Sequence, residues 1–301
     1  APEPRLSPGH AIVQPLLVAI CGSDLHRIHY DDERNYPQAV GTPGHEMIGV
    51  VEAVDAPDAG IAVGDLALTL SLSETEMCEH YLSPVQYLVP VPNGRPLDHL
   101  LIAQQLGTAI YASKRLPNIV GKDAAIIGQG SAGLFLDFMC RRLGARRVIG
   151  LDLVEARAAA GAHFGATHTV DTTAHDAVDA VREITHGRMA DLVIEAAGDV
   201  SAINLTPRLV RQGGHMHFFG IPRGQVIPFD FDAFFRVYGS TTTLSGTSTE
   251  PGLPSFRQAL RMIADGEIDV SPMLTHRLPF ERVLEGFEMA MARNHGAIKI
   301  V

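Results

Sequence analysis

The sequence predicts an α/β protein with two domains, a small β-barrel or sandwich and a parallel sheet covered by helices on both faces. The chain has 301 residues, which is too long for one small module and suits two domains. Hydrophobic residues make up 46% and charged residues 19%, so a sizeable core can be built. The rhythm of the sequence changes at about residue 122, where short apolar runs broken by Gly and Pro give way to alternating strands and helices.

The first hundred residues predict strands, because short apolar stretches alternate with turn residues and helical periods are few. The expected strands cover residues 11–20, 47–54, 64–70 and 87–91. This spacing is typical of a small barrel or sandwich.

The second part predicts a doubly wound parallel sheet, because apolar strands that alternate with helices are buried on both faces. The expected strands lie at residues 123–128, 146–153, 167–171, 191–198 and 213–222, and the helices at 131–144, 154–165, 175–185 and about 201–211. Two further helices at about 253–265 and 281–292 and a strand at 297–301 follow.

Composition argues against several kinds of partner. Asp and Glu outnumber Lys and Arg by 34 to 24, and the net charge of −10 disfavours nucleic acid and anionic membranes. No stretch approaches the roughly 20 apolar residues that span a bilayer, and the first residues show no signal-peptide pattern. The cysteines Cys21, Cys78 and Cys140 are widely spaced and form no CxxC pair, so we expect no disulfide framework and a reducing, cytoplasmic location.

A glycine-rich loop follows the expected strand at 123–128 and opens the helix at 131–144. It reads GQGSAG, with Gly128, Gly130 and Gly133 at the GxGxxG positions. The first glycine allows a tight turn, the second lets a pyrophosphate approach the backbone, and the third lets helix and strand pack closely. In this context the loop predicts a dinucleotide site, although the bare pattern is common by chance.

Asp152 ends the next expected strand and indicates which dinucleotide binds. A carboxylate there accepts hydrogen bonds from the adenosine ribose hydroxyls and repels a 2′-phosphate, which favours NAD over NADP. Arg146, Arg147 and Arg157 lie nearby in the sequence and weaken this preference, because each can pair with a 2′-phosphate.

A second motif places a thiol, a hydroxyl, a carboxylate and an imidazole in the short sequence CGSDLH at residues 21–26. The sequence GHE at residues 44–46 follows it. A thiolate from Cys21 and an imidazole from His45 suit a zinc ion with an open coordination position. Such an ion polarises an alcohol oxygen.

Together CGSDLH, GHE, GQGSAG with Asp152, and THRLPFERVLEGFE at residues 275–288 resemble the zinc-type medium-chain alcohol dehydrogenases, which include sorbitol and threonine dehydrogenases. The resemblance covers nearly the whole chain. It implies a GroES-like β-barrel catalytic domain at residues 1–104, a Rossmann NAD-binding domain at 105–244, and a return to the catalytic domain at 245–301.

The resemblance also implies roles for individual residues. Cys21, His45 and Glu46 match the metal site, Ser23 the hydroxyl that takes the substrate proton, His26 the residue that relays it, and Asp24 the carboxylate that orients His45. The implied cofactor contacts, besides the glycine loop and Asp152, are Thr108, Arg157, Ala197, Gly198, Phe219, Gly220 and Ile221.

Two positions depart from the family pattern. Only Cys78 lies where family members often carry four closely spaced cysteines, so we expect no structural zinc. Gln104 aligns with the remaining ligand of the catalytic zinc, usually Glu, Asp or Cys, and a neutral amide is a poorer ligand.

The expected function is an NAD-dependent dehydrogenase of a secondary alcohol or polyol, or a reductase of the matching ketone, assisted by one catalytic zinc. Two alternatives stay open: a zinc-free reductase of an enone or quinone, and a non-catalytic NAD-binding protein. The expected partner is a small-molecule alcohol or ketone, and pairing into a homodimer or homotetramer, through a strand near 239–246, is compatible with the sequence.

Overall fold

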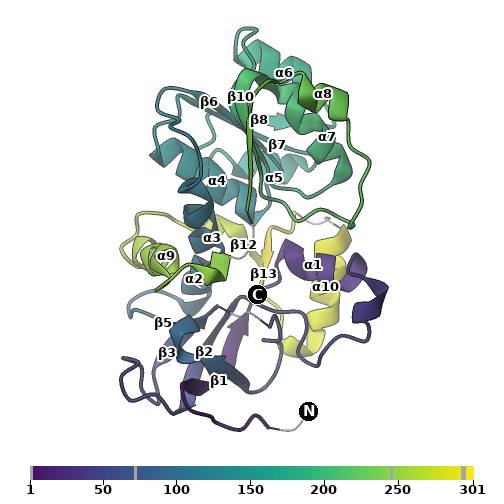
Figure 1. Cartoon of the computed structure of the whole chain (residues 1–301). Helices are drawn as coiled ribbons and strands as arrows, with labels where there is room; N and C mark the ends of the chain where they lie inside the picture. The colour runs from purple at the N-terminus through teal and green to yellow at the C-terminus, as the bar shows by residue number, and fades with distance from the viewer. Residues whose placement is uncertain (1–2, 71–72, 245–246, 293–295) are drawn as a thin grey trace. The chain divides into compact units, whose positions relative to one another are not determined.

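The computed structural model describes residues 3–70, 73–244, 247–292 and 296–301. The chain divides into two compact units, shown in Figure 1. The first unit comprises residues 1–108 and 246–301, and the second comprises residues 109–245. The first unit is therefore discontinuous in sequence, and the residues of the second unit are inserted between its two segments along the chain.

The first unit contains a five-stranded antiparallel sheet in the order β4-β1-β2-β3-β5. Its inner face packs around Val13, Met47, Val51 and Tyr81, all buried. The strands are β1 (His10–Val18), β2 (Met47–Val54), β3 (Leu66–Thr69), β4 (Tyr81–Pro84) and β5 (Leu88–Pro90).

Helices and a short second sheet complete the first unit. Strands β12 (Leu274–His276) and β13 (Lys299–Ile300) pair in parallel, and Ile300 also bridges to Ile20 just after β1. This bridge brings the C-terminal segment against the N-terminal part of the unit. The helices are α1 (Gly22–His29), α2 (Leu97–Leu101), α3 (Ala103–Ser113), α9 (Pro254–Ala264) and α10 (Val283–Ala292), of which α3 continues into the second unit.

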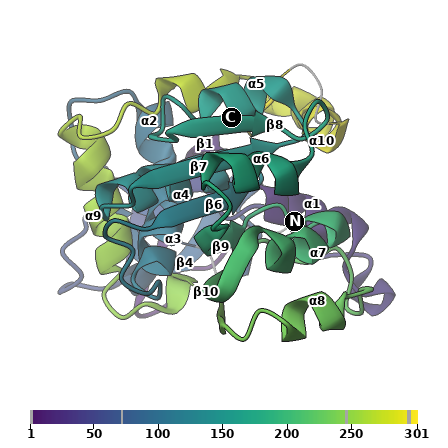
Figure 2. The same cartoon turned by 90° about the horizontal axis from the view of Figure 1, so that it is seen from above.

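The second unit is a six-stranded parallel sheet in the order β11-β10-β9-β6-β7-β8. This is the Rossmann order, in which the strand order reverses between the first strand, β6, and the fourth, β9. In Figure 2 the labelled strands β8, β7, β6, β9 and β10 follow one another across the sheet. The strands are β6 (Asp123–Ile127), β7 (Arg147–Asp152), β8 (His168–Asp171), β9 (Ala190–Glu195), β10 (Val210–Phe218) and β11 (Ser240–Thr243).

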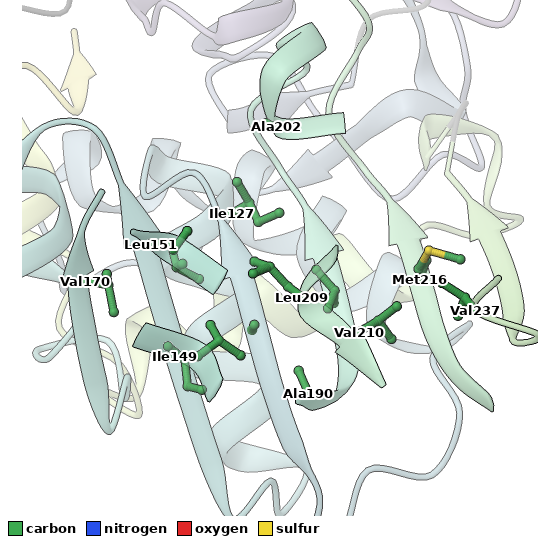
Figure 3. Packing of buried hydrophobic residues seen from close by; sticks show 14 residues of the cluster. Ile127, Ile149, Leu151, Val170, Ala190, Ala202, Leu209, Val210, Met216 and Val237 are labelled. Atoms are coloured by element: carbon green, nitrogen blue, oxygen red, sulfur yellow. The ribbon is translucent and has the colours of Figure 1, made fainter. Parts of the chain in front are cut away.

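Apolar side chains from strands and helices form the core of the second unit, seen in Figure 3. Ile127 and Leu151 from the sheet pack with Ala202 and Leu209 from α7, and Val181 of α6 joins them. Residues that alternate with Ile127 along the strand face the other side of the sheet. The helices are α4 (Ser131–Arg142), α5 (Glu155–Ala160), α6 (Ala177–Ile184), α7 (Val200–Leu209) and α8 (Phe231–Phe235).

The expected fold class is confirmed, and several expected bounds are wrong. The helix expected at 154–165 ends at Ala160, and the strand expected at 213–222 begins at Val210 and ends at Phe218. In the second case Phe219 lies beyond the strand, where its N–H donates to the carbonyl of Glu195. The expected pairing strand near 239–246 contains β11, and its residues 245 and 246 lie outside the described residues.

Two findings bear on the chemical setting. Cys21, Cys78 and Cys140 are free thiols, and Cys140 is buried. Within the described ranges, none of the helices is long and apolar enough to cross a membrane.

Candidate active site

The first candidate residues lie where β1 gives way to α1. Cys21 has an extended backbone and is the N-cap of α1. Its N–H donates to Asp24 Oδ2 at 2.8 Å, so the acid at the third helical position closes the first turn. The sequence CGSD therefore forms a helix start that fixes the Cys21 thiol and the Asp24 carboxylate beside each other.

Asp24 also orients His45. Its Oδ1 lies 3.1 Å from His45 Nδ1, and the carboxylate is only 1% exposed. The opposite ring nitrogen, Nε2, is 3.3 Å from Ser23 Oγ. Burial by itself lowers the pKa of His45, but the charge and the hydrogen bond of Asp24 raise this pKa well above its usual value.

Three candidate ligand atoms converge in the first unit. The Cys21 sulfur, a His45 ring nitrogen and a Glu46 carboxylate oxygen all lie within 4.8 Å of one another. Thiolate, imidazole and carboxylate are the donors that zinc takes in proteins. The residues present therefore fit a metal ion of this type.

Glu46 has a cationic partner that the sequence did not reveal. Lys299 Nζ lies 2.9 and 2.8 Å from the two carboxylate oxygens, and both side chains are fully buried. Burial by itself lowers the pKa of Lys299, but the charges of Glu46 and Cys21 raise it above its usual value. The ammonium group stays charged and offsets the charge of Glu46.

A second buried acid lies near this cluster. Glu76 is fully buried and accepts a hydrogen bond from Thr69 Oγ1. Burial raises its pKa to about 8, against the attraction of His45. Glu76 is therefore mostly protonated at pH 7 and adds little charge to the site.

The amide next to Cys21 is not the one that the alignment indicated. Gln105 Oε1 lies 3.5 Å from Cys21 Sγ, on the first turn of α3. Gln104, which we expected at this position, is also buried. Its main-chain carbonyl accepts a hydrogen bond from Thr108 Oγ1 at 3.2 Å. The Thr108 hydroxyl is 3.4 Å from that of Thr247.

Ser23 and His26 share α1. They are three residues apart, which puts them on the same face of the helix. His26 is half-buried, and its ring centroid lies 6.3 Å from that of Tyr30. The face of α1 that carries Ser23 thus also carries an imidazole one turn further on.

The glycine loop of the second unit has the shape expected of a dinucleotide cradle. Gly128 has a φ of +94°, and a Cβ on Gly133 would lie 1.8 Å from the Gly128 carbonyl oxygen. Gly130 is the N-cap of α4, and a Cβ there would meet no protein atom within 4 Å. The N-terminus of α4 is therefore open to an anion, while Gly133 has no room for a side chain.

Asp152 is tied to this loop. It accepts hydrogen bonds from the N–H groups of Gln129 at 2.6 Å and Val154 at 2.8 Å. Arg157, on α5, is half-buried, and burial lowers its pKa while the charge of Asp152 opposes that change. The acid at the end of β7 thus holds the loop and interacts electrostatically with the arginine.

Glu195 organises the remaining candidate cofactor residues. Its Oε1 accepts the N–H groups of Ala197 and Gly198, and its carbonyl oxygen accepts those of Phe219 and Gly220. A Cβ on Gly198 would lie 2.1 Å from the carbonyl oxygen of Ile221, so the two turns touch. Ile221 itself is half-exposed.

Comparison with known proteins gives the family. An alcohol dehydrogenase GroES-like domain matches residues 7–92, and a zinc-binding dehydrogenase domain matches residues 132–265. The chain belongs to the zinc-type medium-chain dehydrogenase superfamily. It is therefore an oxidoreductase of the alcohol dehydrogenase type that uses a nicotinamide cofactor.

Relatives of this dehydrogenase carry several substrate names. L-threonine 3-dehydrogenase of Bacillus subtilis is 26% identical, with 100% of this chain and 93% of the relative aligned. Sorbitol dehydrogenase of the same organism is 25% identical, over 100% of this chain and 92% of the relative. Among solved structures, an alcohol dehydrogenase from Thermus sp. ATN1 superposes with a TM-score of 0.85 at 23% identity, covering 100% of this chain and 94% of the other.

Three residues that contact the candidate site residues were missed by sequence reasoning. Glu195 carries a signal, because a charged residue ends an otherwise apolar strand in DLVIEAAG. Lys299 and Gln105 carry none, since a lysine near the end of an apolar strand and a glutamine beside another glutamine are ordinary. Only the fold brings these two residues to Glu46 and Cys21.

Proposed function

We propose that this dehydrogenase oxidises a secondary alcohol or a polyol with NAD, assisted by a zinc ion held at Cys21 and His45. The convergence of three ligand atoms within 4.8 Å carries this proposal. The names of the threonine and sorbitol dehydrogenase relatives, both of hydroxyl-bearing substrates, support it.

Zinc, when bound, supplies positive charge that stabilises negative charge developing on the substrate oxygen. The chain's own residues prepare the site for it. Asp24 holds the Cys21 backbone and the His45 ring in place before any ligand arrives. We assign Ser23 Oγ, beside the far nitrogen of His45, as the group that takes the proton of the substrate, and His26 as the relay.

The cofactor half of the proposal rests on the second unit. Gly128, Gly130 and Gly133 shape the loop for a pyrophosphate, and Asp152 supplies the carboxylate for the adenosine ribose. We propose NAD rather than NADP, because the carboxylate of Asp152 repels a 2′-phosphate.

Two further features support proposals about location and assembly. Three free thiols support a reducing, cytoplasmic setting. Strand β11 is at the edge of its sheet and presents an outer row of backbone groups, with Ser240, Thr241 and Thr243 exposed. We propose that a second copy of the chain covers this edge in a homodimer.

The test combines metal analysis with an NAD-coupled substrate screen. We expect about one zinc per chain and activity on secondary alcohols or polyols, and we expect Cys21→Ala to lose both. Full activity of Cys21→Ala would contradict the proposal.

One observation favours a second candidate, a zinc-free reductase. Lys299 already occupies both oxygens of Glu46, and a neutral amide lies beside Cys21. Activity on enones or quinones that survives exhaustive chelation would support this candidate. Tight NAD binding without turnover of any alcohol or ketone would instead indicate a non-catalytic protein.

A further inference from the structure

The carboxylate of Glu46, one of the candidate metal ligands near Cys21, is already paired with a buried lysine. Glu46 is the nearest carboxylate, yet Lys299 lies within 2.9 Å of each of its oxygens. Both side chains are fully buried, so water screens this pair little. Moving Glu46 onto a cation would leave the ammonium of Lys299 buried without its counter-charge, which is costly.

Gln105 lies close enough to Cys21 to supply a donor atom in place of Glu46. Its side chain is 5% exposed, and Oε1 is 3.5 Å from Cys21 Sγ, with the thiol as the donor. A cysteine binds a metal as the thiolate, so metal binding removes that thiol proton. The thiolate sulfur and the amide oxygen are both electron-pair donors, and at 3.5 Å they lie close enough for one cation to accept from both.

We propose that Gln105, through Oε1, is the third protein donor of the metal site, next to Cys21 and His45. The inference rests on the proposed function, since it takes a metal ion at Cys21 and His45 as given. Glu46 then stays with Lys299 as a neutral pair behind the site. A set of one thiolate, one imidazole and one amide neutralises less of the cation's charge than a set with a carboxylate. Such a donor set would hold the ion less tightly and would leave more of its positive charge to act on the substrate oxygen.

The test changes each glutamine in turn and measures metal affinity. The variants are Gln105→Leu and Gln105→Glu, with Gln104→Leu and Gln104→Glu as matched controls one residue away. Zinc affinity is measured by competition with a coloured chelator, and the ligand set by the absorption spectrum of the cobalt(II)-loaded protein. Thermal unfolding with chelator present checks that each variant folds.

We expect Gln105→Leu to weaken zinc binding by at least about 10–100-fold, since that range already applies to groups that only orient the ligands. Gln105→Glu should strengthen zinc binding by at least about tenfold, because a carboxylate is a better zinc ligand than an amide. Both should shift the cobalt spectrum, and the two Gln104 variants should do neither. Unchanged affinity and spectrum in both Gln105 variants, or a response at Gln104 instead, would overturn the inference.

Zinc affinity of the wild-type protein, taken together with the NAD-coupled substrate screen, separates this inference from the proposed function. If the wild-type protein binds zinc through Gln105 but oxidises no alcohol, the inference is supported and the proposed activity is contradicted. Wild-type protein that is an active alcohol dehydrogenase without binding zinc removes the inference and keeps the hydride transfer.

Discussion

Two fully buried acids, Glu46 in the first unit and Asp137 in the second, are stabilised in opposite ways. In the first unit, the carboxylate of Glu46 is fully buried and is matched by the ammonium of Lys299. In the second unit, Asp137 on α4 is also fully buried, but neither of its oxygens has a hydrogen-bond donor among the described residues. Burial raises the pKa of Asp137 well above its usual value, even though Gln129 lowers it.

The difference fits the charge of the ligand that each unit is proposed to hold. A cation site tolerates buried carboxylates, provided that their charges are balanced when the metal is absent. A pyrophosphate site gains from acids that are neutral, because an ionised acid below the loop repels the ligand. Gln129 is part of that loop, and its amide oxygen also has no donor in the described part of the chain. A protonated Asp137 has a proton to donate there.

Breaking the charged pair should have the largest effect. Lys299→Met leaves Glu46 buried without its counter-charge, and we expect a loss of about 3–5 kcal/mol in the free energy of unfolding. The double variant Glu46→Gln with Lys299→Met should recover most of that loss. Urea unfolding in the presence of a chelator measures both. A single variant as stable as the double variant would show that the pair is not a charged unit.

Glu195 tests the neutral-acid pattern next. Burial raises its pKa to about 7, against its hydrogen bonds from Ala197 and Gly198, while a free glutamic acid titrates near 4.5. As pH rises from about 4.5 to 7, the unfolded chain loses this proton first, so the folded state loses stability. Glu195→Gln keeps an acceptor oxygen and does not titrate. Its stability relative to wild type should therefore grow by about 3 kcal/mol across that range.

Urea unfolding at several pH values checks this expectation. The exposed Glu183→Gln on α6 serves as the control and should show no such growth. A constant difference between Glu195→Gln and wild type from pH 4.5 to 8 would contradict the assignment.

Two substitutions in the glycine loop test whether the second unit holds a pyrophosphate at this position. Gly133→Ala puts a Cβ 1.8 Å from the carbonyl oxygen of Gly128, so we expect a loss of about 1–3 kcal/mol in stability. Gly130→Ala meets no protein atom within 4 Å and should fold normally, yet bind NADH more weakly. Thermal unfolding and NADH titration separate the two effects. Normal NADH affinity in Gly130→Ala would mean that the pyrophosphate does not approach this residue.

Asp137 tests the same pattern on α4, and here only the direction of the effect is predicted. Asp137→Asn replaces an acid that resists ionisation with a group that never ionises and still donates a hydrogen bond. We expect the variant to be more stable than wild type at pH 7, by an amount that grows as pH rises above about 4. The sign follows from the raised pKa, because stability is lost in wild type as pH rises above about 4, where the unfolded aspartate ionises. A gain that shrinks with rising pH would contradict the neutral state of Asp137.

Much of the fold follows from the sequence because periodic apolar runs and glycine turns act locally. The strand at 47–54 was predicted to the residue, and the sheet at residues 123–171 closely. Helix α1 was not predicted, because its first residues lie in the motif CGSDLH, which we interpreted for its reactive side chains and not as the start of a helix. Its cap bond becomes visible only in the structure.

The candidate site is harder to predict than the fold. Its details depend on which of two adjacent helix residues faces Cys21 and on contacts between segments that are far apart in the sequence. Gln104 and Gln105 are adjacent in sequence, but one step along a helix turns a side chain by about 100°. An alignment does not resolve which of them faces Cys21. Lys299 is separated from Glu46 by 253 positions, so no local pattern links them.

The discontinuity of the first unit sets an order of events during synthesis. Glu46 leaves the ribosome long before Lys299, and at about 5–20 residues per second the interval is roughly 10–50 seconds. The contiguous residues 109–245 can fold within that interval, whereas the first unit is still missing residues 246–301. The nascent chain should therefore fold from its middle outward, and the residue cluster at Cys21, His45 and Glu46 is completed last, when β13 brings Lys299 to Glu46.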